Sequence, residues 1–264
     1  MSRGLLLVLL ALPPAGLAAA DAAAPAWQAL AAYRPVQALP QFEQLAARGG
    51  PDARAARFGE ALSLLAQPLP VANRVGRAQA LLEALAADGD DDLALGARFY
   101  LGRLAEFQSD PPDPRRAAVE FRRLIAGHPD SVWAQAAVPR LALLVLYTAA
   151  GPADPAARIA EAERLLPDAR TAAAEADLRL VITDAVFHYL LPDALARSHL
   201  VALARCAVLE ATTRADVLVQ AGEVSRLTGH PAEAAGYYRT FLAEYPREPR
   251  QFQVRLKLAQ VAGP

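Results

Sequence analysis

The sequence has a single cysteine and few aromatic residues, which make up 6% of its 264 positions. With Cys206 alone no intrachain disulfide can form, which excludes a small secreted module held together by disulfides. Runs rich in β-branched residues, which are typical of strands, are also absent. Alanine dominates instead, and hydrophobic residues reach 54%. This composition predicts an all-α protein whose helices pack closely through small side chains.

An excess of charge of one sign is missing too. Lys and Arg together number 27 and Asp and Glu 28, for a net charge of −1. The cations are almost all arginine, with Lys257 the only lysine, and they alternate with acidic residues instead of forming a block. We therefore expect no binding to nucleic acid or to a membrane surface through charge.

The first twenty residues, 1–20, are organised as a secretory signal peptide. Arg3 gives a positive start, Leu5–Leu12 an apolar stretch, and Ala18–Ala20 a small-residue cleavage site before Asp21. The pattern predicts an exported chain, with a bacterial periplasm favoured and secretion to the medium as the alternative.

An uncleaved membrane anchor is the competing interpretation of this segment. Pro13 and Pro14 interrupt the apolar stretch, which is also short for a span of about 20 residues. No later segment approaches such a span, so we expect no transmembrane segment in the mature chain.

Motifs of catalysis and metal binding are missing as well. There is no GxSxG, SxxK, GxGxxG or P-loop motif, and the histidines lack metal-site spacing. The acidic run 88–92 lacks the spacing of a calcium loop, and we interpret it as a turn with Asp92 near a helix start. Asp177 and Asp184, seven apart on one predicted helix face, are interpreted as solvated carboxylates. We expect no enzyme, no catalytic residue, no cofactor and no metal ion.

Prolines and glycines divide the rest of the chain. Residues 21–52 predict a leader with one or two short helices split by Pro35 and Pro40. Residues 53–264 predict one domain of helix pairs. The expected helices are 53–66, 74–87, 93–108, 114–127, 131–149, 154–166, 170–191, 192–210, 213–228, 231–245 and 249–261.

The segment Asp113–Ala134 returns in altered form 117 residues later, at His230–Gln251. Six of the first seventeen positions are identical, and bulky residues replace one another elsewhere, as Tyr238 replaces Phe121. A step near 39 residues relates the second helices of all pairs. The aligned small residues are Ala78, Ala117, Ala156, a point near 194–196, and Ala234. This step predicts an α-solenoid of about five stacked antiparallel helix pairs.

The best-matched pairs resemble the tetratricopeptide repeat in the positions of their small, aromatic and proline residues. The matching residues are Gly222, Ala234, Tyr238 and Pro246 in one pair, and Gly102, Ala117, Phe121 and Pro129 in the other. The junction 128–134 is similar to those of exported bacterial members, including the repeat-built outer-membrane assembly lipoprotein and the periplasmic coordinator of the Tol and Pal system. The resemblance implies a helical-repeat fold and a protein-binding function.

The resemblance also implies that the first helix of each pair lines a concave face. The groove positions fall on Phe99, Arg103, Glu106, Val219, Glu223 and Arg226. Alternating charge there would hold the backbone and termini of a peptide by charge-assisted hydrogen bonds. The alternative is a solvated face on which Arg and Glu pair with one another.

The expected function is that of an exported, non-catalytic scaffold or adaptor that binds a protein or peptide of the cell envelope. One alternative is an accessory protein or enzyme of peptidoglycan or envelope metabolism. Another is a self-assembling homo-oligomer, which exposed Phe252, Val254 and Leu258 on the last helix would favour.

Overall fold

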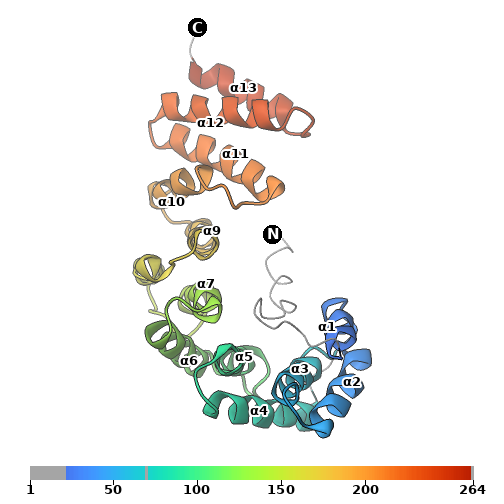
Figure 1. Ribbon diagram of the computed structural model, residues 1–264. Coiled ribbons are helices and arrows are strands. Elements are labelled where there is room, and N and C mark those ends of the chain that lie inside the picture. The colour runs from blue at the N-terminus through green and yellow to red at the C-terminus, as the bar shows by residue number, and fades with distance from the viewer. Residues whose placement is uncertain (1–21, 69–70, 263–264) are drawn as a thin grey trace. The chain divides into compact units, whose positions relative to one another are not determined.

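The computed structural model describes residues 22–68 and 71–262, and all regular structure in these ranges is helical (Figure 1). The predicted signal peptide, 1–20, lies outside the described residues. The helices are α1 (Ala24–Ala31), α2 (Pro35–Arg48), α3 (Ala53–Leu65), α4 (Ala72–Ala87), α5 (Asp92–Phe107), α6 (Pro114–Gly127), α7 (Val132–Tyr147), α8 (Pro155–Glu163), α9 (Ala172–His188), α10 (Ala194–Ala204), α11 (Ala211–Leu227), α12 (Pro231–Glu244) and α13 (Gln251–Ala262), with a 3₁₀ turn at Leu166–Asp168. The all-α prediction is confirmed. Among the described helices, none combines the length and apolar character needed to cross a bilayer.

Short polar side chains fix where several helices begin. Among the described residues, five of them accept a hydrogen bond from a backbone N–H three residues further on: Asp91, Asp113, Ser131, Asp154 and Thr171. These bonds satisfy N–H groups that a helix start leaves free. The acidic run 88–92 thus supplies the cap of α5, with Asp92 as its first residue.

The N-terminal helices differ from expectation at one proline. Pro35 begins α2, as predicted, but Pro40 lies inside α2 and does not end it. Pro40 cannot donate to the carbonyl of Val36, so one helix bond is lost. Both side chains are exposed, which lets water solvate the freed carbonyl.

The chain divides into two compact units that meet between Ala134 and Gln135. In the first unit the helices pack in succession, α1 against α2 and so on up to α5 against α6. In the second unit the same holds from α8 to α13, and α11, α12 and α13 lie one upon another in Figure 1. Arg158 of α8 joins α7 by donating to the carbonyl of Leu146 at 2.9 Å. Within each unit, this packing of successive helices is the solenoid-like arrangement that was predicted.

The step of the repeat is visible in the first helices of the pairs. Helices α9 and α11 have 17 residues each, and both their first and their last residues are 39 apart. Helices α5 and α7 have 16 residues each and are 40 apart. Of the aligned small residues in the second helices, Ala156 is exposed, so the predicted alignment is wrong at α8. The buried face of α8 is carried by Ile159 and Ala162 instead.

In each of the two best-matched pairs, a glycine of the first helix packs against an aromatic ring of the second. A Cβ atom on Gly102 of α5 would lie 2.6 Å from Cε1 of Phe121 on α6. A Cβ atom on Gly222 of α11 would lie 2.7 Å from Cδ1 of Tyr238 on α12. Both rings are fully buried. Because no side chain intervenes, the ring of the second helix packs directly on the backbone of the first.

We expect Gly222→Ala to lower the free energy of unfolding by about 1–3 kcal/mol, because the new methyl group overlaps the Tyr238 ring. The matched control is Gly236→Ala, in the same hairpin, where a Cβ would meet nothing within 4 Å. The control should gain about 0.5–1 kcal/mol from helix propensity. Urea unfolding monitored by circular dichroism measures both, and equal effects of the two changes would refute the packing argument.

Candidate functional site

The predicted groove residues of α5 lie mostly inside the first unit. Phe99 is 1% exposed, and its ring centroid is within 5.6 Å of those of Tyr100, Phe121 and Trp133. Its side chain therefore contributes to the core. Arg103 and Glu106 form an i,i+3 ion pair at 3.3 Å, and their side chains are only 16% and 7% exposed.

The predicted groove residues of α11 share one face of that helix in the second unit. Val219 is half-buried, and the side chains of Glu223 and Arg226 are 28% and 35% exposed. Arg226 donates to Glu223 Oε1 at 2.5 Å. Glu223 Oε2 also accepts from the Tyr238 hydroxyl at 3.1 Å and from Lys257 Nζ at 2.6 Å. Glu223 thus joins α11 to both α12 and α13.

The electrostatics of this cluster follow from these contacts. The hydrogen bond from Arg226, with those from Lys257 and Tyr238, lowers the pKa of Glu223 to about 2 against the opposing effect of burial. Burial, together with the negative charge of Glu223, raises the pKa of Tyr238 to about 12. At neutral pH the carboxylate is therefore charged and the phenol neutral. The cluster holds its charges in fixed positions near the surface.

A second ion pair between α11 and the start of α13 was not anticipated from the sequence. Arg250 Nη1 lies 2.7 Å from Asp216 Oδ1, as Lys257 Nζ lies 2.6 Å from Glu223 Oε2. The two acids are seven residues apart on α11, and the two cations are seven apart at α13. Seven residues are two helical turns, so the pairs form on matching faces of parallel helices. The equal spacing of the two acids and of the two cations was the feature of the sequence from which these ion pairs could have been predicted.

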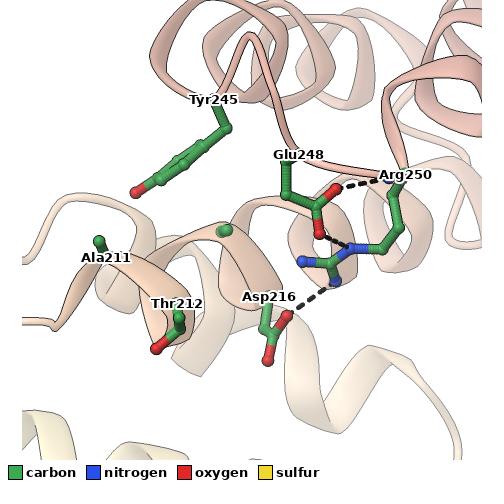
Figure 2. Close-up of a pocket in the computed structure, with 7 residues that line it drawn as sticks. Ala211, Thr212, Asp216, Tyr245, Glu248 and Arg250 are labelled. Carbon is green, nitrogen blue, oxygen red and sulfur yellow. Dashed lines mark hydrogen bonds and ion pairs between the residues drawn. The ribbon is translucent and has the colours of Figure 1, made fainter.

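A pocket of about 240 Å³ lies at the start of α11 (Figure 2). Its lining residues are Ala211, Thr212, Ala215, Asp216, Tyr245, Glu248 and Arg250. Figure 2 shows Arg250 between Glu248, 2.5 Å away, and Asp216. Arg250 offsets only one of the two carboxylates, so the pocket keeps a net negative charge and suits a neutral or cationic group better than an anion. Asp216 lies one turn before Val219, so the pocket adjoins the predicted groove face.

The buried histidine of the second unit has structural contacts. His199 of α10 is 1% exposed, with Nε2 3.0 Å from Glu163 Oε1 and Nδ1 3.4 Å from Nη1 of Arg179. Burial lowers its pKa, the Glu163 carboxylate opposes that shift, and Arg179 adds to it. In the part of the chain that the structure describes, no three His, Cys, Asp or Glu residues gather as metal ligands would.

The described residues define the class of this molecule as an all-α protein built of repeated, successively packed helix pairs. No known family model matches the sequence, and no curated protein matches it either. Membership of the tetratricopeptide family thus depends on the residues themselves and is a proposal.

We expect Glu223→Gln to lower the free energy of unfolding by about 1–2 kcal/mol at pH 7, since Lys257 and Arg226 lose their counter-charge at a partly exposed site. The folded pKa of Glu223 lies below its ordinary value of 4.5. Its stabilisation is therefore complete above about pH 4.5 and is lost as the pH falls toward 2.

The difference between parent and Glu223→Gln should accordingly shrink between pH 7 and pH 3 in urea titrations. Glu210→Gln, at the exposed carboxylate that precedes α11, is the control and should cost only about 0.5 kcal/mol, the effect of one charge at a helix start. A difference independent of pH would contradict the ion-pair assignment.

Proposed function

We propose that the protein is an exported scaffold or adaptor of tetratricopeptide type that binds a protein or peptide of the cell envelope. The binding surface is the face that the first helices of the pairs form within each unit, called here the inner face. The repeated contact of a glycine with a ring, Gly102 with Phe121 and Gly222 with Tyr238, carries the proposal. It occurs at the positions on which the resemblance depends. Stacked repeats of this kind bind partners through extended surfaces.

The inner face of α11 offers the best-supported contacts for such a partner. Glu223 and Arg226 are partly exposed and are fixed by each other and by Lys257. Fixed charges lose little side-chain entropy when they bind. They would accept from, and donate to, the backbone of a peptide. The adjoining pocket, which keeps a net negative charge, would take one neutral or cationic side chain beside them.

Photo-crosslinking in cells of the native host tests this surface. A benzoylphenylalanine in place of Val219, on the inner face, should capture one defined envelope protein. The same residue in place of Arg239, exposed on the second helix α12, is the matched control and should not. Identical adducts at both positions, or none at either, would refute binding through the inner face.

Export is proposed on the pattern of Arg3, Leu5–Leu12 and Ala18–Ala20. The expected result is a mature chain that begins at Asp21 and is released by osmotic shock. Intact mass of the released protein measures the cleavage site. A chain that retains Met1 in the cytosolic fraction would overturn this part of the proposal.

Self-assembly is the second candidate, because α13 exposes two large apolar side chains. Phe252 is 71% and Leu256 51% exposed, and they lie four residues apart on one face. Val254, whose exposure would also have favoured this candidate, is 1% exposed, since it lies on the opposite face, and Leu258 is half-buried. Analytical sedimentation of the parent and of Phe252→Ser tests self-assembly. If α13 mediates it, the variant should sediment as a smaller particle than the parent.

A further inference from the structure

Helices α9 and α11 carry the same pair of acidic positions. Because the two helices are 39 residues apart along their whole length, Asp177 takes the place of Asp216, and Asp184 that of Glu223. Both pairs are seven residues apart, or about 10 Å along a helix. The repeat has therefore placed two carboxylates on the inner face twice.

The two pairs differ in what neutralises them. On α11 the carboxylates pair with Arg250 and Lys257. The residues 39 positions before these cations are Ala211 and Leu218, which carry no charge. The acidic residues of α11 therefore have counterparts in α9, whereas the cations that pair with them have no charged counterparts in α11.

The α9 carboxylates are consequently open to a cation from outside. Asp177 and Asp184 are both exposed, and within residues 22–68 and 71–262 neither takes part in an ion pair. Desolvation by the surrounding chain raises the pKa of Asp177, so a nearby cation would stabilise its charged form.

Aromatic rings lie at the C-terminal end of the α9 face that carries Asp177 and Asp184. His188 follows Asp184 by one turn, and its ring centroid lies 5.3 Å from that of Tyr147 on α7. Burial, then the charges of Asp184 and Tyr189, raise the pKa of Tyr147 to about 12, so its phenol is neutral at pH 7. Tyr147 is 38% exposed. A guanidinium held by Asp184 would be able to stack on this ring.

We propose that Asp177, Asp184 and Tyr147 form a binding site for a partner segment carrying two cationic side chains, with arginine favoured beside Tyr147. Such a segment presents its cations about 10 Å apart, as two arginines seven residues apart on a helix do. This inference depends on the proposed function and adds the charge of the partner to it. The occupant is a basic segment of another protein, chosen because among residues 22–68 and 71–262 no cation pairs with either carboxylate.

Fluorescence anisotropy at low ionic strength tests the site on the mature chain from Asp21. The probe is a labelled alanine-rich helical peptide with two arginines seven residues apart, and the control peptide has them five apart, on different faces. The first peptide should bind more tightly. Asp177→Asn with Asp184→Asn should weaken binding about tenfold, and Tyr147→Leu a few-fold, while Tyr147→Phe should retain affinity.

Glu210→Gln, which removes an exposed carboxylate outside the proposed site, is the matched control and should bind the peptide as the parent does. The double Asn variant should keep or slightly raise the parent's urea midpoint, since neither carboxylate has an ion-pair partner among the described residues and burial disfavours the charge of both. Binding unchanged in that folded variant, or no preference between the peptides, overturns the inference. If crosslinking at Val219 succeeds while the basic peptide fails, the inference is wrong and the proposed function stands.

Discussion

The direct packing of an aromatic ring on a glycine backbone is the constraint on which the helix pairs depend. At Gly222 the ring of Tyr238 occupies the space of a side chain, and Phe121 does the same at Gly102. Such contact lets two helix axes approach closely and fixes where they cross. The Tyr238 ring then delivers its hydroxyl to Glu223 at the surface. The core contact and the surface charge cluster are therefore parts of one arrangement.

Ion pairs between successive first helices add a second level of order. Asp216 with Arg250, and Glu223 with Lys257, connect α11 to α13 across the intervening second helix. Partly exposed pairs stabilise a fold only modestly, so their larger effect is to fix side-chain positions on the inner face. Among the described residues, neither Asp177 nor Asp184 of α9 has such a partner.

The helices, their order and the 39-residue step could be predicted from the sequence because each rests on local chemistry. Capping residues such as Asp113 and prolines such as Pro231 act within one turn, and hydrophobic spacing acts within one helix. The prediction was wrong at Pro40, where exposure makes a lost helix bond tolerable. It was also wrong at Ala156, because a short α8 shifts the buried face toward Ile159.

The sequence by itself determined the helical class, the paired repeats and the positions where a glycine must face a ring. Only the tertiary structure decided which predicted groove residues are accessible. Phe99 and Val219 occupy equivalent positions, three residues before Gly102 and Gly222, yet Phe99 is enclosed by three rings and Val219 is only half-buried. Burial and ion pairing depend on neighbours distant in the chain, such as Trp133 for Phe99. Which distant residues become neighbours is decided by tertiary packing, and a local sequence pattern carries no information about it.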